Sequence, residues 1–256
     1  MLNKKGPLEP PKFLSIVIPA HNEEGVIART VTDIYNELSG AKINHEILVV
    51  NDHSKDSTEE ILKKTTAAIP TLRYVNNPGL GGFGLAVRCG LENFKGDAVA
   101  IVMADESDSP KDIVRFFREL EAGYECAFGS RFMKESKIID YPWPKLVLNR
   151  FANLFVQIIF KLPYNDVTNA FKMYRHHVID GLRPFMSHHF NLTVELPLKA
   201  LVRGYTYSVI PNSWTNRKAG VSKFKIKEMG SRYMFIIIYC FIEKWLSRGD
   251  YYRRDL

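Results

Sequence analysis

Short apolar segments alternate with amphipathic ones along the first half of the chain. Apolar runs that end in polar or turn residues predict five buried strands, at Phe13–Pro19, His45–Val50, Leu72–Asn76, Ala98–Ala104 and Tyr124–Gly129. Helical periodicity between these runs predicts four helices, at Gly25–Leu38, Ser57–Ala68, Gly84–Phe94 and Pro110–Ala122. Strands without apolar–polar alternation, each followed by a helix, are typical of a parallel sheet covered on both faces. The pattern therefore predicts a Rossmann-like α/β fold.

The second half of the chain follows a different pattern. We expect an apolar helix at Leu146–Leu162 and a strand at Tyr205–Trp214, then a basic loop and the apolar segment Tyr233–Ile242. This last segment has ten residues, whereas a transmembrane helix needs about 20. We therefore expect no membrane span, and the segment is either a buried core helix or a helix that lies in a membrane interface.

The composition is that of a globular protein, with 46% hydrophobic and 25% charged residues. The net charge of +7 is unevenly distributed, because residues 1–140 hold 17 basic and 21 acidic side chains while residues 141–256 hold 18 and 7. The basic half suits an anionic partner such as phosphate, nucleic acid or an acidic membrane surface, and is also compatible with plain solvated charge. The three cysteines form no Cys-x-x-Cys pair and indicate a reduced, cytosolic protein.

Five loops follow the predicted strands and carry most of the clustered carboxylates and glycines. They are Ala20–Glu24, Asp52–Asp56, Asn77–Gly84, Asp105–Asp108 and Ser130–Phe132. Each loop alone is explained by ordinary turn chemistry, since Asp, Asn, Ser and Gly all favour turns. Because ligands of open α/β sheets bind at the carboxyl ends of the strands, the five together predict a binding site at that edge.

One of these loops has the composition of a metal site. Asp105, Glu106 and Asp108 lie within four residues directly after an apolar strand. Carboxylates this close repel one another unless a cation neutralises them, and Mg²⁺ or Mn²⁺ prefers carboxylate oxygens. A solvated acidic loop before a helix is the alternative interpretation.

Read in order, the loop sequences resemble a known family. The motifs are Pro-Ala-His-Asn-Glu-Glu at 19–24, Asn-Asp-His-Ser-Lys-Asp-Ser-Thr at 51–58, Asn-Pro-Gly-Leu-Gly-Gly at 77–82 and Met-Ala-Asp-Glu-Ser-Asp-Ser-Pro at 103–110. This set resembles the family-2 inverting glycosyltransferases of the GT-A fold. The segments around Arg131, Asn149, Asp166, Glu195 and Arg217 are similar to the dolichyl-phosphate mannose synthase branch.

The resemblance implies a role for particular residues. It implies a nucleotide site made of Pro19, Asn22, Glu23, Asp52, Gly79, Gly82, Asp105, Arg217 and Lys223. It implies an acceptor-phosphate site at Arg131 and Arg150, and catalytic roles for Asp105, Asp108, Arg131 and Arg217. Asp166 and Thr168 match positions near the sugar, or else form a capped turn.

This chain departs from the family pattern at the metal loop. A gapless alignment of the family's Asp-x-Asp puts its first aspartate on Ala104 and its second on Glu106. The chain offers Asp105 and Asp108 instead, so the metal ligands are expected among Asp105, Glu106 and Asp108, with both registers open. A second departure is Asn51, which stands where an aspartate is common.

The resemblance implies transfer of a hexose, with inversion and metal assistance, from a nucleotide diphosphate sugar to a polyprenyl or dolichyl phosphate. GDP-mannose is the favoured donor, and a UDP-hexose remains open. An acceptor phosphate is mostly dianionic at pH 7 and needs no general base, which fits the lack of an obvious one. The alternatives are a family-2 enzyme with a glycan or lipopolysaccharide hydroxyl acceptor, using Glu195 or Asp108 as base, and a non-catalytic sugar-nucleotide binder.

The expected organisation follows from this interpretation. Residues 1–12 are expected to form a disordered tail, residues 13–223 a GT-A catalytic domain, and residues 224–256 a basic, hydrophobic extension at a membrane interface. The protein is then expected to be peripheral on the cytoplasmic face of a membrane, with Lys218, Lys223, Lys225, Lys227 and Arg232 facing anionic head groups. No nucleic-acid reading motif is present, so no nucleic-acid partner is expected.

Overall fold

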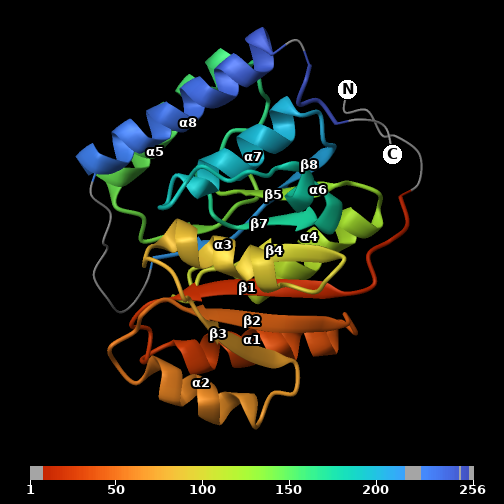
Figure 1. Cartoon of the computed structure of the whole chain (residues 1–256), viewed down its shortest axis with the longest axis vertical. Helices are drawn as coiled ribbons and strands as arrows, with labels where there is room; N and C mark the ends of the chain where they lie inside the picture. Colours follow the sequence, from red (N-terminus) through yellow and green to blue (C-terminus); the bar gives the residue numbers. More distant parts are fainter. Residues whose placement is uncertain (1–7, 217–225, 248, 254–256) are drawn as a thin grey trace.

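The computed structural model describes residues 8–216, 226–247 and 249–253, and its centre is a seven-stranded sheet (Figure 1). The strands are β1 (Leu14–Ala20), β2 (His45–Asn51), β3 (Leu72–Asn76), β4 (Ala98–Ile101), β5 (Cys126–Ser130), β7 (Lys172–Arg175) and β8 (Tyr207–Pro211). They lie in the order β3-β2-β1-β4-β7-β5-β8, and only β7 runs antiparallel to its neighbours. The predicted α/β fold with a mostly parallel sheet is therefore confirmed.

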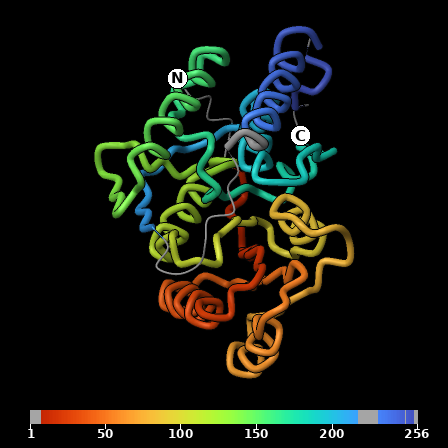
Figure 2. The backbone as a smooth tube through the Cα atoms, turned by 90° about the vertical axis from the view of Figure 1, so that its left-hand side faces the viewer, coloured from red at the N-terminus to blue at the C-terminus, as the bar shows by residue number. Residues whose placement is uncertain are grey.

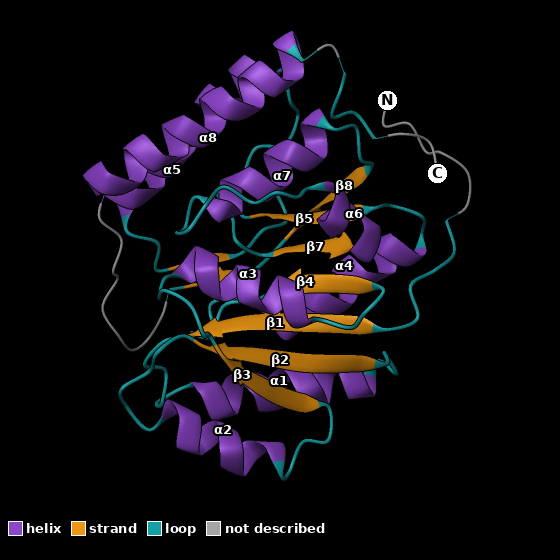
Figure 3. Ribbon diagram, viewed as in Figure 1, coloured by secondary structure: helices purple, strands orange, loops and turns teal. Residues whose placement is uncertain are grey.

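Helices cover both faces of the sheet (Figures 2 and 3). They are α1 (Ile27–Gly40), α2 (Thr58–Thr66), α3 (Phe83–Asn93), α4 (Pro110–Glu121), α5 (Trp143–Phe160), α6 (His176–Gly181), α7 (Leu192–Val202) and α8 (Ile226–Leu246). Apolar side chains of α1, α2 and α4 share a core with Ile16 and Ile18 of β1, whereas those of α3, α6 and α7 share the other core with Val17. β1 is buried along its whole length because adjacent residues point into opposite cores.

The sequence pattern predicted the first five strands and the later helix α5, but other elements after β5 differ from the expectation. β7, α6 and α7 were not predicted, and the strand expected at Tyr205–Trp214 is two strands, β8 and β9 (Trp214–Thr215). β9 leaves the large sheet and pairs with β6 (Ile138–Ile139). β7 has only four residues, Lys-Met-Tyr-Arg, and two of them are charged, so hydrophobicity gave no sign of a buried strand.

The two ends of the chain pack more closely than expected. The prediction of a disordered tail over residues 1–12 is wrong for residues 8–12, because the backbone N–H of Lys12 donates to Asp97 at 2.9 Å and Arg175 donates to the carbonyl of Glu9 at 2.6 Å. Pro11 is also buried. Residues 1–7 lie outside the described part of the chain.

Helix α8 contains the predicted Tyr233–Ile242 segment and is partly a core helix. Ile236, Ile237 and Cys240 belong to the main hydrophobic core. Near the end of α8, Glu243 forms a two-pronged ion pair with Arg203 at 2.7 and 2.9 Å, and both side chains are buried. The core of the protein therefore extends beyond residue 223, where we expected the catalytic domain to end.

Glu243→Gln should lower the free energy of unfolding by about 3 kcal/mol, because it leaves the Arg203 guanidinium buried without its charged partner. Chemical denaturation of the full chain measures this change. The matched control is Glu121→Gln, which breaks the exposed pair with Arg118 and should cost less than about 1 kcal/mol. Equal effects of the two substitutions would contradict the anchoring of α8 by this pair.

Candidate functional site

A cavity of about 1140 Å³ opens at the carboxyl ends of β1, β2 and β4. Nine of the residues expected at the site line it: Pro19, Asn22, Glu23, Asp52, Gly79, Gly82, Asp105, Asp108 and Arg131. They come from separate loops, and the parallel strands bring them to one edge of the sheet. Of the other expected residues, Glu106 and Arg150 do not line the cavity, and Arg217 and Lys223 lie outside the described residues.

Asp52 connects two of these loops. Its carboxylate accepts hydrogen bonds from the Asn77 side chain and from the backbone N–H of Gly82, both at 2.8 Å. Gly82 has a backbone φ of 144°, a conformation that residues other than glycine rarely adopt. A Cβ atom on Gly84 would lie 2.6 Å from the backbone of His189, so this position also requires glycine. The glycine loop is thus held against β2 on one side and against the 187–190 segment on the other.

The acidic loop places two of its three carboxylates in the cavity. Asp108 is 8% exposed, and burial together with the nearby Asp105 charge raises its pKa to about 7. A buried carboxylate with a second acid beside it is the environment that a hard divalent cation relieves, so Asp105 and Asp108 fit such an ion.

Glu106 is directed away from the cavity and pairs through both carboxylate oxygens with Arg29 of α1. Its φ of 59° turns the chain sharply between the two aspartates. Within the described ranges, no three His, Cys, Asp or Glu side chains form a group that could hold a metal. Of the two registers left open for the metal ligands, Asp105 and Asp108 line the cavity, while Glu106 is paired with Arg29 of α1.

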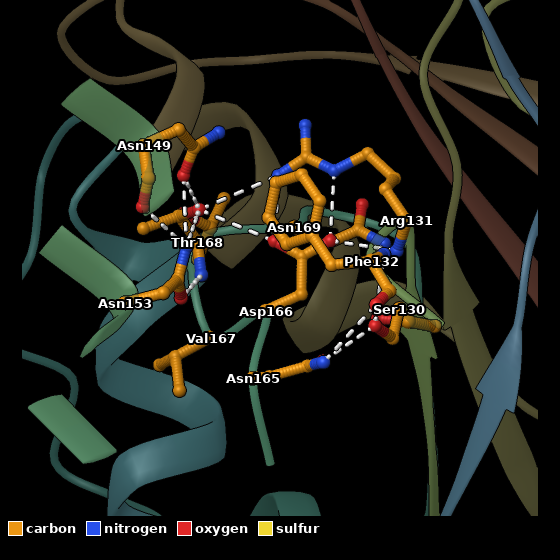
Figure 4. A network of polar contacts seen from close by, with 12 residues as sticks. Ser130, Arg131, Phe132, Asn149, Asn153, Asn165, Asp166, Val167, Thr168 and Asn169 are labelled. Atoms are coloured by element: carbon orange, nitrogen blue, oxygen red, sulfur yellow. Dashed lines mark hydrogen bonds and ion pairs between the residues drawn. The ribbon is translucent and has the colours of Figure 1, made fainter. Parts of the chain in front are cut away.

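Arg131 is buried at the end of β5 and is held by Asp166 (Figure 4). Asp166 accepts from Arg131 Nε at 2.8 Å, from Nη2 at 2.7 Å and from the backbone N–H at 2.9 Å. Thr168 continues the network to α5, because it contacts Asn149 at 2.5 Å and accepts from Asn153 at 3.1 Å. The expected sugar-site residues Asp166 and Thr168 therefore join the Arg131 loop to helix α5.

Arg150 occupies a different position from the one expected. It is exposed, and its guanidinium lies 4.7 Å from the centre of the Phe132 ring. Two other cations, Lys145 of α5 and Arg232 of α8, line the cavity. From the sequence, Arg232 is expected only at lipid head groups, and no role is expected for Lys145. Nothing local in the sequence marks them, because they reach the cavity only through the packing of α5 and α8.

The cavity also has an apolar wall, made of Leu148, Phe151, Ala152, Phe155 and Val156 from α5, and Met234 and Ile237 from α8. His189 also lines the cavity, whereas His176 lies outside it and donates from Nδ1 to the carbonyl oxygen of Gly96 at 2.8 Å.

Lys172 of β7 lies beneath the network, with 1% of its surface exposed. Its ammonium donates to the carbonyl oxygens of Val167 at 3.1 Å and Thr193 at 3.2 Å. Burial lowers the pKa of Lys172 to about 7. This side chain therefore joins the 166–168 turn to the first turn of α7.

Comparison with known proteins identifies the class. The protein-family model described as "Glycosyl transferase family 2" matches residues 15–183, and the chain belongs to this family. It is thus a glycosyltransferase. Its fold is that of the GT-A enzymes, as shown by glucosyl-3-phosphoglycerate synthase from Mycobacterium tuberculosis, solved with Mn²⁺, UDP and phosphoglyceric acid. That structure is 15% identical with a TM-score of 0.68, and the match covers 91% of this chain and 78% of that one.

Two relatives with curated names indicate which type of family-2 glycosyltransferase the chain resembles. The chain is 27% identical to a polyprenol monophosphomannose synthase of Mycolicibacterium smegmatis over 88% of its own length and 89% of the relative's. It is 25% identical to the uncharacterized glycosyltransferase YkcC of Bacillus subtilis, over 84% of its own length and 64% of the relative's. The resemblance to the polyprenyl-phosphate mannose synthase type of family 2 is therefore confirmed.

The stability of the protein should depend on the protonation of Lys172. An unfolded chain binds a proton at this lysine up to a pKa of about 10.4, whereas the folded protein loses it near pH 7, so stability rises with pH between these values. From about pH 7.5 to about pH 9, the wild type should gain about 2 kcal/mol more than Lys172→Met. Urea denaturation at both pH values measures the difference, with the exposed Lys111→Met as control. A Lys172→Met variant with the wild-type slope would contradict the assignment.

Proposed function

We propose that this glycosyltransferase transfers a hexose from a nucleotide diphosphate sugar to a polyprenyl phosphate, with inversion at the anomeric carbon. GDP-mannose is the donor that we favour. The observation that carries the proposal is the composition of the cavity, in which polar sheet-edge loops meet an apolar wall built from two helices. A donor with a charged diphosphate and an acceptor with a long hydrocarbon chain require such a combination, and the polyprenol monophosphomannose synthase relative supports it.

The donor is proposed to lie along the sheet edge. Pro19, Asn22, Glu23, Asp52 and the Gly79–Gly82 loop would hold its nucleoside, because these residues line the cavity at the carboxyl ends of β1, β2 and β3. We propose that Asp105 and Asp108 hold Mg²⁺ or Mn²⁺, which would neutralise charge on the leaving diphosphate. The Mn²⁺–UDP complex of the structurally similar synthase supports use of a divalent metal.

The acceptor is proposed to enter between α5 and α8, with its phosphate near Arg131, Lys145 and Arg232. Arg131 is held in a fixed orientation by Asp166, and the two other cations come from the helices that form the apolar wall. A phosphate monoester has a second pKa near 6 and is mostly dianionic at pH 7, so it can attack without losing a proton to the enzyme. Positioning and charge neutralisation then supply most of the rate enhancement.

A hydroxyl acceptor would need a general base, and the structure removes one of its two candidates. Glu195 lies on α7 outside the cavity lining, fully buried. Its carboxylate accepts from the backbone N–H groups of Met186 and Ser187, both at 2.7 Å, and from Lys199 at 2.6 Å. A carboxylate enclosed in this way does not reach a substrate, which favours the phosphate acceptor.

We further propose that α5 and α8 dock on the cytoplasmic face of a membrane, where a polyprenyl phosphate would be embedded. Both helices present large apolar side chains to solvent: Trp143, Val147, Phe151, Leu154 and Ile158 on α5, and Met234, Phe235, Ile238, Phe241, Ile242, Trp245 and Leu246 on α8. Large apolar side chains left exposed on neighbouring helices are typical of a surface that meets a partner or a membrane. No helix of the described residues is long and apolar enough to cross a bilayer.

The function is tested by a matrix of donors and acceptors. GDP-mannose, UDP-glucose and UDP-galactose are each incubated with Mn²⁺ and either a short polyprenyl phosphate or 3-phosphoglycerate. We expect transfer from GDP-mannose to the polyprenyl phosphate, at least about tenfold faster than from either UDP donor. Transfer to 3-phosphoglycerate alone would overturn the lipid acceptor, and a preference for a UDP donor would overturn mannose.

Membrane docking is tested with substitutions outside the cavity. Ile158→Glu and Ile238→Glu each place a charge on the exposed surface, and each should lower binding to phosphatidylglycerol-containing vesicles about tenfold. GDP affinity should stay unchanged, because neither residue lines the cavity. The control is Asn36→Asp, which adds a negative charge on α1 at the other end of the molecule (Figure 1). Vesicle flotation at wild-type level in both variants would refute the docking surface.

A further inference from the structure

Helix α1 makes two polar contacts with the loop that carries Asp105 and Asp108. Both contacts come from its first turn. The Thr30 hydroxyl donates to the carbonyl oxygen of Ala104 at 2.7 Å, and Thr30 is buried. Next to it, the Arg29 guanidinium donates through Nε and Nη2 to the two carboxylate oxygens of Glu106. The loop is therefore connected to α1 both through its backbone and through its middle acid.

These contacts accompany a particular loop conformation. Glu106 adopts a φ of 59°, which residues other than glycine rarely take, and this reverses the chain between the two aspartates. On either side of it, Asp105 accepts from the backbone N–H of Ser107 at 3.2 Å, and the carbonyl of Ser107 accepts from Thr215 at 3.1 Å. While Glu106 is paired with Arg29 of α1, Asp105 and Asp108 both lie on the cavity side.

The negative charges of the loop are also separated between α1 and the cavity. Three carboxylates within four residues repel one another, and the Arg29 guanidinium neutralises the one that does not line the cavity. The two carboxylates on the cavity side are the ones that can reach a cation there. If Glu106 were a ligand, its carboxylate would have to leave Arg29 and the left-handed turn would have to rearrange.

We propose that Arg29 and Glu106 form a positioning pair that holds Asp105 and Asp108 in the geometry that binds the divalent cation, and that Glu106 is not itself a ligand. This inference rests on the proposed metal site and goes beyond it, because it assigns a function to a helix residue outside the cavity. It also explains how the chain tolerates Ala104 at the position of the family's usual aspartate: Thr30 holds the Ala104 carbonyl, and the ligands lie one and four residues further on.

The test uses the full chain and two readouts. Hydrogen exchange of the metal-free protein reports the order of residues 104–108, and electron paramagnetic resonance of free Mn²⁺ in the presence of GDP reports metal affinity. Arg29→Gln and Glu106→Gln should each speed exchange in this loop and weaken Mn²⁺ binding two- to fivefold, the range of an exposed ion pair. The reversed pair, Arg29→Glu with Glu106→Arg, should recover most of both losses. Asp108→Asn should weaken Mn²⁺ binding more than about a hundredfold.

The control is Arg118→Gln, which breaks an exposed Arg–Glu pair on α4 and should change neither readout. A loss for Glu106→Gln as large as that for Asp108→Asn, with Arg29→Gln at wild-type affinity, would make Glu106 a ligand and overturn the proposal. Wild-type exchange in both single variants would overturn it as well. Absence of Mn²⁺ binding in the wild type would instead refute the proposed metal site, and the exchange data would still decide whether the pair orders the loop.

Discussion

The buried ion pair of Arg131 with Asp166 connects the two halves of the molecule. Arg131 directly follows β5 and Asp166 precedes β7, the antiparallel strand that lies between β4 and β5 in the sheet. A buried guanidinium is tolerated only when its charge and its N–H groups are satisfied. Asp166 accepts from Nε and Nη2 of the Arg131 guanidinium, and also from the backbone N–H of Arg131. Through Thr168, the same turn orients α5, so one ion pair relates the sheet edge to a wall of the cavity.

Other buried charges extend this arrangement to the far side of the cavity. Lys172 ties the 166–168 turn to α7, and the Glu195–Lys199 pair inside α7 holds the preceding segment through Met186 and Ser187. Arg203 at the end of α7 then anchors α8 through Glu243. Apolar packing alone would let these helices slide, whereas paired charges permit few positions. The cavity walls that we assign to the lipid acceptor are therefore tied to the sheet edge that we assign to the donor.

The first half of the fold and most of the nucleotide side could be predicted from the sequence. Continuous apolar strands and amphipathic helices set the order of β1 to β5, and the end of each parallel strand marks a loop of the site. Asp52, Asp105 and Asp108 lie where that rule puts them. The sequence did not predict β7, because a four-residue strand with two charged residues has no hydrophobic pattern. It did not predict that Lys145 lines the cavity either, because a single lysine in a helix has no distinctive pattern.

The sequence by itself determined the α/β class, the family and the loops that meet at the sheet edge, because these depend on local periodicity and on motifs in a set order. Only the tertiary structure decided which residues of each motif line the cavity. Glu106 and Asp108 are two residues apart and chemically equivalent in sequence, but a left-handed turn and Arg29 direct one away from the cavity while the other lines it. Likewise α8 is both core and exposed surface, since its apolar residues exceed what α7 can cover.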